Sequence, residues 1–186
     1  MYMPHAARHW TADDVRALPD DGNRYEVVDG ELLVTPAPTW PHQRAVLALV
    51  RELDAYVRRL RIGEVLISPA DVALGQSMVQ PDVFVTAHDA SAPPGSWEQL
   101  APLLLAIEIL SPGTARHDRL TKRRLYQRHG VPEYWIIDID ARAIERWRPG
   151  DERPEWLGER IAWQPEGATE PLVIDLEPLF REITGR

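Results

Sequence analysis

The stretch "LLLAIEILSPGTARHDRLTK", residues 103–122, decides both the fold and the chemistry. Seven of the eight residues from Leu103 to Leu110 are apolar, which is typical of a strand buried on both faces of a sheet. The exception is Glu108, a carboxylate near the end of this strand. Because burying an unpaired carboxylate costs several kcal/mol, we expect Glu108 to face a cationic partner or a metal ion.

Two residues that end the strand, and then a basic helix, follow it. Pro112 and Gly113 end it, and the pattern then predicts a helix over residues 115–129 that stops at Gly130. Lys122 lies on this helix and is the only lysine among 21 basic residues. An acid inside a strand and a single lysine on the next helix are therefore the two unusual features of the stretch.

The neighbouring segments extend the pattern on both sides. "EYWIIDI", residues 133–139, predicts a second buried strand, and the single helix before it indicates a crossover that places the two strands parallel. "RYEVVDGELLVT", residues 24–35, predicts a β-hairpin that turns at Asp29 and Gly30. Apolar residues spaced by three and four over residues 41–60 predict an amphipathic helix.

Shorter patterns complete the expected fold. They predict a capped helix after Thr11, strands over residues 64–68, 71–74, 82–86 and 142–148, a loop over residues 87–102, and edge strands and a terminal helix beyond Pro149. This order predicts an α/β (α+β) fold, a mixed β-sheet flanked by helices with an N-terminal β-hairpin. We expect one domain over residues 1–186, with its core at about residues 24–148.

Composition excludes some classes of function. The chain has no cysteine, so it has no disulfides and no thiolate metal site. No apolar run approaches the roughly 20 residues of a membrane span. The first ten residues, "MYMPHAARHW", lack the apolar core of a signal peptide, so we expect a cytoplasmic protein without a membrane partner.

The distribution of charge leaves two interpretations open. The net charge of −8 argues weakly against nucleic acid as a partner. Residues 111–130, however, hold six basic residues and one acid, a local charge of +5. This segment is either a solvated helix face or a phosphate-contacting patch on an otherwise acidic protein.

Two carboxylates are expected at strand ends. Asp82 opens one predicted strand, and Glu108 lies near the end of another. Such ends can be neighbours in a mixed sheet, and two carboxylates at close range need a proton or a cation between them. Hard oxygen ligands at a partly open site suit Mg²⁺ or Mn²⁺, which can activate water and neutralise charge on a phosphoryl group.

Lys122 has two interpretations. If its helix folds back over the strand ends, the ammonium can position an attacking water or stabilise developing charge. A desolvated ammonium can also lose its proton at reachable pH, which a guanidinium cannot do. Alternatively, Lys122 follows Asp118 by four residues and forms an exposed pair on the helix surface, worth roughly 0.3–0.5 kcal/mol.

An aspartate, a glutamate and a lysine in this order resemble the PD-(D/E)XK nuclease superfamily. More closely, the chain resembles the Uma-type family of bacterial restriction endonucleases. The matching segments, "YEVVDGEL", "PHQRAVLALVREL", "QPDVFV", "LLLAIEILSPGTARHDRLTKRRLY" and "GVPEYWIIDI", cover most of residues 24–140. The resemblance implies a restriction-endonuclease-like core and Mg²⁺-dependent hydrolysis of phosphodiester bonds.

The resemblance also implies roles for particular residues. Asp82 and Glu108 would bind the metal, with the Ile109 carbonyl as a third ligand, and Lys122 would be the basic residue. The superfamily pattern departs at one point, since its lysine belongs at position 110, where this chain has Leu110. The Uma-type family resembles a variant in which a helix lysine serves instead.

Two further residues are candidates for the same site. Glu26, in "YEVVDGEL", is either an additional acid near the metal or an ordinary hairpin residue. His42 begins the long predicted helix, where a neutral imidazole can orient water, or where a histidine simply caps the helix or lies on the surface.

These observations predict a metal-dependent endonuclease that hydrolyses DNA with water as the nucleophile. Because cutting both strands of a duplex usually needs two active sites, we expect a symmetric homodimer. One alternative is a non-catalytic nucleic-acid-binding or scaffold protein that retains the fold. Another is a phosphohydrolase for small molecules, which the acidic net charge favours.

Overall fold

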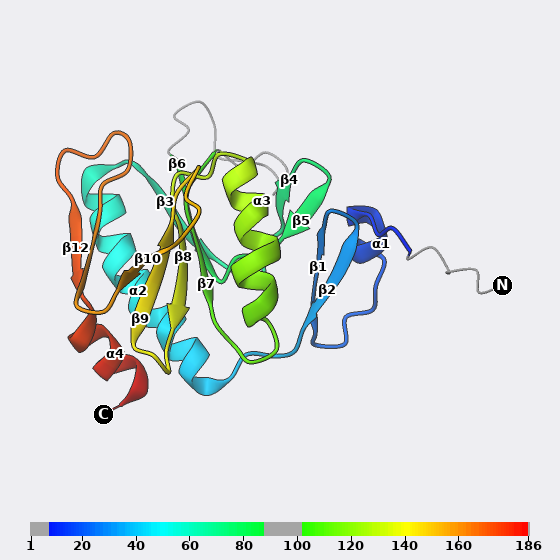
Figure 1. The fold of residues 1–186 in the computed structure, drawn as a ribbon, viewed down its shortest axis with the longest axis horizontal. Helices are drawn as coiled ribbons and strands as arrows, with labels where there is room; N and C mark the ends of the chain where they lie inside the picture. Colours follow the sequence, from blue (N-terminus) through cyan, green and yellow to red (C-terminus); the bar gives the residue numbers. More distant parts are fainter. Residues whose placement is uncertain (1–7, 88–101, 186) are drawn as a thin grey trace.

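The computed structural model of the chain describes residues 8–87 and 102–185. A central β-sheet carries helices on both faces, and a smaller sheet built on the N-terminal hairpin lies to one side (Figure 1). The loop expected over residues 87–102 falls almost wholly outside the described residues. The mixed sheet flanked by helices confirms the predicted fold class.

The central sheet has the strand order β10-β9-β8-β7-β6-β3. Its strands are β3 (Gly63–Ile67), β6 (Val83–Ala87), β7 (Leu103–Ile109), β8 (Tyr134–Asp138), β9 (Ala143–Trp147) and β10 (Glu155–Leu157). All seven residues of β7 are buried, as expected for an apolar run inside a sheet. β7 and β8 run parallel, which confirms the crossover, whereas the other neighbouring strands are antiparallel.

One face of the central sheet is covered by α2 (Trp40–Leu60) and α4 (Leu176–Thr184). Pro41 lies in the first turn of α2, where its fixed φ suits a helix start, and the left-handed Arg61 ends the helix. Leu49 and Leu53 of α2 pack in one core cluster with Ile107 of β7. The strands β11 (Arg160–Trp163) and β12 (Leu172–Asp175) form a two-stranded sheet that contributes to the same cluster.

The other face carries the helical segment that follows β7. The sequence predicted a regular helix over residues 115–129. In the structure, a π-helical turn (His117–Lys122) leads directly into α3 (Arg123–Arg128). π-helical turns are rare and occur often at functional sites. This wide turn carries Asp118 and Lys122, and both of these polar side chains are buried.

The smaller sheet has the order β2-β1-β5-β4, from β1 (Arg24–Val28), β2 (Glu31–Thr35), β4 (Val72–Leu74) and β5 (Ser77–Val79). The predicted hairpin is confirmed, and Asp29 and Gly30 turn it with positive φ. The helix α1 (Ala12–Arg16) begins with the expected capping box at Thr11. Val28 and Leu33 pack in one cluster with Leu125 of α3, which fixes the hairpin sheet beside that helix.

No helix within residues 8–87 and 102–185 combines the length and the apolar character needed to cross a membrane.

Candidate active site

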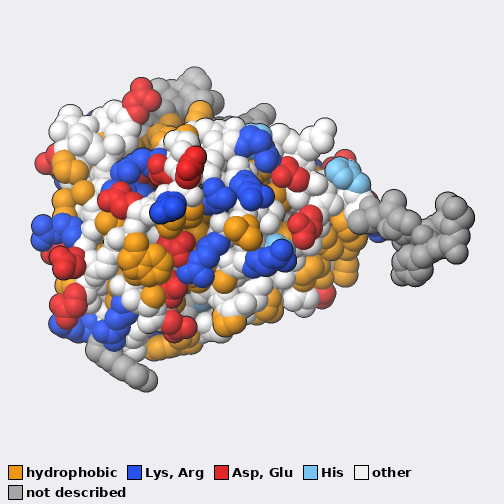
Figure 2. All heavy atoms as spheres, in the orientation of Figure 1, with side chains coloured by type: hydrophobic (Ala, Val, Ile, Leu, Met, Phe, Trp, Pro, Cys, Tyr) orange, Lys and Arg blue, Asp and Glu red, His pale blue; other side chains and the backbone are white. Residues whose placement is uncertain are grey.

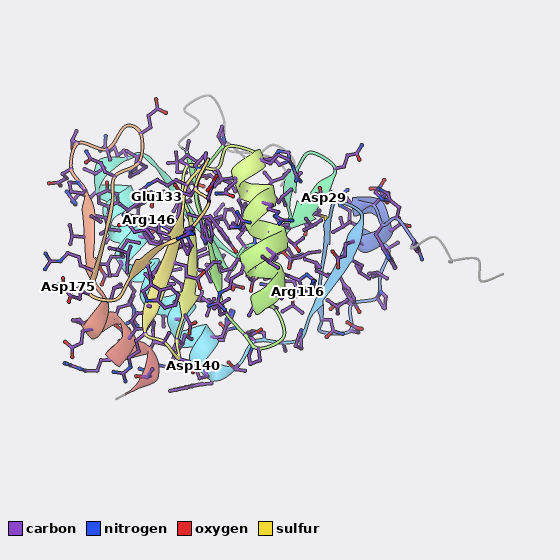
Figure 3. The ribbon with its side chains drawn as sticks, viewed as in Figure 1. Asp29, Arg116, Glu133, Asp140, Arg146 and Asp175 are labelled. Carbon is purple, nitrogen blue, oxygen red and sulfur yellow. The ribbon has the colours of Figure 1, made fainter. Side chains whose placement is uncertain are left out.

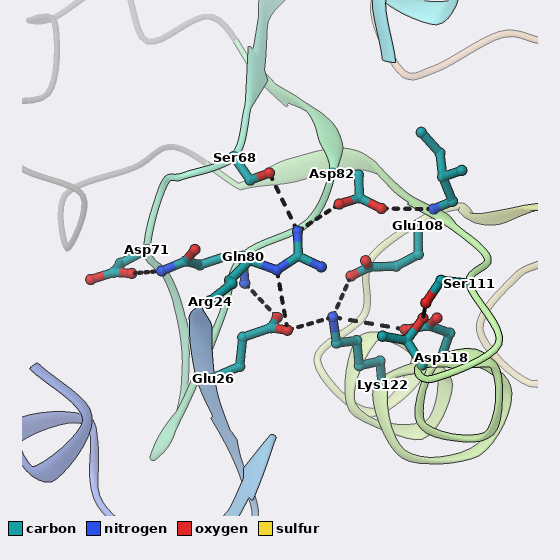
Figure 4. A network of polar contacts seen from close by, with 12 residues as sticks. Arg24, Glu26, Ser68, Asp71, Gln80, Asp82, Glu108, Ser111, Asp118 and Lys122 are labelled. Carbon is teal, nitrogen blue, oxygen red and sulfur yellow. Dashed lines mark hydrogen bonds and ion pairs between the residues drawn. The ribbon is translucent and has the colours of Figure 1, made fainter. Parts of the chain in front are cut away.

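Asp82 and Glu108 come together at the ends of neighbouring strands. Asp82 lies one residue before β6, and Val83 pairs with Ile107 of β7 in antiparallel register. Continuing that register places Asp82 opposite Glu108, so both side chains project from the same face of the sheet. Each residue is only 1% exposed, and the two carboxylates lie side by side in Figure 4.

Asp82 is held by three groups from three elements. Its Oδ2 accepts a hydrogen bond from the Ile109 main-chain N–H (2.8 Å) and lies 3.1 Å from His42 Nε2. Its Oδ1 accepts from Arg24 Nη1 at 2.6 Å. Burial alone raises the pKa of Asp82, but the His42 hydrogen bond and the Arg24 charge outweigh it and hold the pKa below its ordinary value. Asp82 is therefore an ionised carboxylate.

The main chain of Ile109 faces the same point. The register of β6 and β7 places Pro81 opposite Ile109, and proline has no N–H to donate to the sheet. The N–H and C=O of a strand residue point to the same edge. Since the Ile109 N–H already reaches Asp82, its carbonyl lies on the Asp82 side and receives no ladder hydrogen bond from position 81.

Lys122 is buried among three acids. Its Nζ lies 2.8 Å from Glu26 Oε2, 3.0 Å from Glu108 Oε1 and 3.8 Å from Asp118 Oδ1 (Figure 4). Because Lys122 is 1% exposed, the interpretation as a surface pair with Asp118 is wrong. Burial lowers the pKa of Lys122, yet the charges of these carboxylates raise the pKa above its ordinary value. In this arrangement the side chain stays an ammonium, which does not favour the loss of a proton that the sequence left open.

Glu108 and Asp118 behave differently from Asp82. Burial raises the pKa of Glu108 more than Lys122 lowers it, and the neighbouring acids raise it further. Burial also raises the pKa of Asp118. Tyr126 donates its hydroxyl to Glu108 Oε1 at 3.2 Å. These two carboxyls are therefore the groups of the cluster that favour a proton when no further cation is present.

The cluster holds more acids than bases. Four buried acids, Glu26, Asp82, Glu108 and Asp118, contact three basic side chains, Lys122, Arg24 and His42. With all four acids ionised and His42 counted as neutral, the cluster carries two net negative charges, which one divalent cation would neutralise. Protons on Glu108 and Asp118 are the other way to reach neutrality, in agreement with their raised pKa values.

Arg24 is the site residue that the sequence analysis missed. It is the first residue of β1, and its guanidinium reaches across to Asp82, with Ser68 Oγ at 3.4 Å. Glu26 lies two residues further along the same strand, so both side chains share a face. That spacing from Glu26 was the one signal in the sequence that could have identified Arg24.

A cleft of about 970 Å³ opens in front of this cluster. Its wall includes Arg24, His42, Asp82, Ile109 and Ser111. Glu26, Glu108 and Lys122 do not line the cleft and lie behind the first group of residues. A ligand in the cleft therefore meets Asp82, Arg24 and the Ile109 main chain first.

The donor set fits a hard divalent cation. No group of three or more His, Asp or Glu side chains is preassembled as a metal site within the described residues. What those residues offer is the two carboxylates of Asp82 and Glu108 and the Ile109 carbonyl, three oxygen donors of the kind that Mg²⁺ or Mn²⁺ takes. To bind an ion, Asp82 and Glu108 must exchange contacts that Arg24 and Lys122 now make.

The basic residues of the segment after β7 have mixed surroundings. Arg119 pairs with Glu145 and Asp138, and Arg128 pairs with Asp29. Arg116 and Arg124 are exposed, and Figure 3 shows Arg116 beside the lower end of the helical segment that follows β7. Lys and Arg side chains gather over the middle of this face, with acids among them (Figure 2). A phosphate-contacting patch here stays a prediction.

The fold and the site together define the class of protein. Its central sheet is mixed, and the ends of two neighbouring strands present two carboxylates beside a buried lysine. The model of the Uma2 family, described as "Putative restriction endonuclease", matches residues 12–184. The chain belongs to this family, which confirms the resemblance seen in the sequence. Family membership supports a nuclease.

A solved structure shares the fold. It is the crystal structure of "a putative nuclease belonging to DUF820" from Anabaena variabilis, with a TM-score of 0.75 and 22% sequence identity. The match covers 94% of this chain and 99% of that one. A comparison with curated proteins gives no match.

Proposed function

We propose that the chain is a metal-dependent endonuclease that hydrolyses phosphodiester bonds of DNA. The observation that carries this proposal is the position of Asp82, Glu108 and the Ile109 carbonyl at one point of the sheet. These are three hard oxygen donors in a cluster whose excess of negative charge suits a divalent cation. The family description supports the nuclease part of the proposal.

Asp82, Glu108 and the Ile109 carbonyl would hold Mg²⁺ or Mn²⁺ at the wall of the cleft. When bound, such an ion lowers the pKa of water and neutralises charge on a phosphoryl group. His42 and the Ile109 N–H keep Asp82 ionised and fix its orientation. Lys122 fixes Glu108 and Glu26 and supplies positive charge behind the reacting group.

The proposal is tested by titrating Mg²⁺ or Mn²⁺ against supercoiled plasmid, single-stranded DNA and RNA in parallel. Cleavage should require the metal and should disappear in Asp82→Asn. The matched control is Asp54→Asn, which removes an acid paired with Arg58 on the outer face of α2. Metal-independent cleavage, or equal activity in Asp82→Asn, would refute the proposal.

A small-molecule phosphohydrolase is the second candidate, and the cleft lining favours it. Beside Asp82, the wall carries the acids Asp20, Asp71, Asp138 and Asp140, which would repel a long polyanion. DNA affinity that falls steeply with salt would support the nuclease, because binding a nucleic acid releases counterions. Hydrolysis of a phosphomonoester without measurable DNA affinity would support the second candidate, and metal binding without any turnover would support a non-catalytic scaffold.

We further propose that two copies act together on duplex DNA, since each site can cut one strand. Early linear product from a plasmid, together with a dimer in sedimentation measurements, is the expected result. Nicked circles from a monomer would contradict it.

A further inference from the structure

Arg24 occupies the one oxygen of Asp82 that a cation could take. Oδ2 of that carboxylate is already engaged by His42 and by the Ile109 N–H. Among the residues that the structure describes, only Arg24 Nη1 donates to Oδ1, at the short distance of 2.6 Å. A cation of the protein itself therefore lies where the proposed function needs a metal ion.

The remaining contacts of this guanidinium are poor. Its Nε is buried and has no hydrogen-bond partner among the described residues, with Glu26 Oε2 at 3.8 Å. The Nη1 contact with Ser68 Oγ is long, at 3.4 Å. An arginine has five N–H donors in a planar fork that matches the oxygens of a phosphate. Arg24 also lines the cleft, so such an anion can reach it.

We infer that Arg24 is a phosphate-binding residue that pairs with Asp82 only while the site lacks its ion. Once a divalent cation takes Asp82 Oδ1, the guanidinium is released and binds an oxygen of the substrate phosphate. This inference rests on the proposed function. It assigns Arg24 two successive partners, a carboxylate of the protein and then a phosphate group.

The two partners predict effects of opposite sign. Without Arg24, its guanidinium no longer competes for Asp82 Oδ1, so metal binding in the absence of substrate becomes tighter. Without Arg24, the phosphate also loses a charged, forked donor, so phosphate binding becomes weaker. A residue with a merely structural role would weaken both or change neither.

The first test measures Mn²⁺ binding by calorimetry without nucleic acid. Charged hydrogen bonds of this kind correspond to roughly tenfold or more in an equilibrium constant, so Arg24→Gln should bind Mn²⁺ about tenfold more tightly than the parent. Arg24→Lys, which keeps the charge, should lie between them. The control is Arg119→Gln, since Arg119 lines the same cleft but pairs with Glu145 and Asp138. It should leave Mn²⁺ affinity unchanged.

The second test measures binding of deoxythymidine monophosphate to the Mn²⁺-saturated protein. Arg24→Gln should lose about tenfold or more in this affinity, and Arg160→Gln, which removes an exposed partner of Asp175 outside the cleft, should not. Melting temperatures of all variants show whether each one is folded. A second neutral variant, Arg24→Met, is measured as well and stands in for Arg24→Gln if that variant does not fold. Unchanged or weaker Mn²⁺ binding in both neutral variants would overturn the inference, and so would unchanged nucleotide binding.

Neither measurement depends on turnover, so the inference and the proposed function can fail separately. If the parent cleaves nothing while Arg24→Gln shows both affinity changes, the nuclease proposal fails and the assignment of Arg24 stands. If the parent cleaves DNA but the affinities of Arg24→Gln match those of the parent, the assignment fails alone.

Discussion

The Lys122 ammonium lies 2.8 Å from Glu26 Oε2, closer than its 3.0 Å contact with Glu108. Glu26 belongs to the hairpin sheet and Lys122 to the π-helical turn on the central sheet. One buried ion pair therefore joins the two parts of the fold that face the site, so the lysine supports the structure, besides the role in hydrolysis that we propose for it.

Replacing Lys122 by methionine should destabilise the metal-free protein by about 3–5 kcal/mol, because it leaves buried carboxylates without their counter-charge. The loss should be larger at pH 8 than at pH 5. The remaining acids would keep protons in the folded state that they release on unfolding, so stability falls as pH rises. Urea unfolding at both pH values measures this. Arg124→Met, an exposed change on the following helix, should stay within about 0.5 kcal/mol.

Replacing Lys122 by arginine keeps the charge and tests shape. The site is fully buried, so the larger guanidinium should cost roughly 1–3 kcal/mol from overpacking. Hydrolysis should fall as well, since Glu26 and Glu108 would be displaced. Arg123 is a poor control, because its guanidinium lies 4.6 Å from the centre of the Trp147 ring. Arg124→Lys is the matched control, and parental cleavage rates in Lys122→Arg would remove the lysine from the mechanism.

The metal-free protein should lose stability as pH rises above the ordinary pKa of Glu108. Burial raises the pKa of Glu108 in the folded state from 4.5, so the folded protein keeps a proton that the unfolded chain releases. Between these two pKa values each pH unit costs up to about 1.4 kcal/mol for this group. Denaturant titrations in EDTA should show the decline, and Glu108→Gln should flatten it. A parental slope in Glu108→Gln would show that another group is responsible.

Metal binding should release protons. An ion that takes the Glu108 carboxylate competes with the proton favoured by its raised pKa. Calorimetry with Mn²⁺ in buffers of different ionisation enthalpy reports the number released as the slope of apparent enthalpy against buffer enthalpy. A slope of zero between pH 5 and 7 would contradict the raised pKa or the metal contact.

Local patterns were sufficient for most of the fold. The apolar run before Pro112 predicted β7, the Asp29-Gly30 turn predicted the hairpin, and one intervening helix predicted the parallel pairing of β7 with β8. Each of these features depends on residues close in sequence. β5, a strand of three residues, was missed, although the equally short β4 beside it was predicted.

The site was only partly predictable. The sequence singled out Asp82, Glu108, Lys122, Glu26, His42 and Ile109, and the structure brings all six together, although their roles stay proposals. Arg24 was missed because its contact with Asp82 depends on how the hairpin sheet docks on the central sheet. The π-helical turn was missed because its apolar spacing resembles that of an α-helix. The burial of Asp118 and Lys122 was missed because a pair four residues apart looks the same in the sequence whether it is buried or exposed.

Because Pro81 has no N–H, the carbonyl of Ile109 accepts no hydrogen bond from the opposite position of the sheet. If this oxygen binds the proposed metal ion, mutations at position 109 leave it in place, because the carbonyl belongs to the main chain and not to the side chain. The sensitive position lies on the neighbouring strand instead. Almost any other residue at position 81 would bring an N–H that donates a hydrogen bond to this carbonyl. A mutational scan for loss of function would then identify Pro81 rather than Ile109.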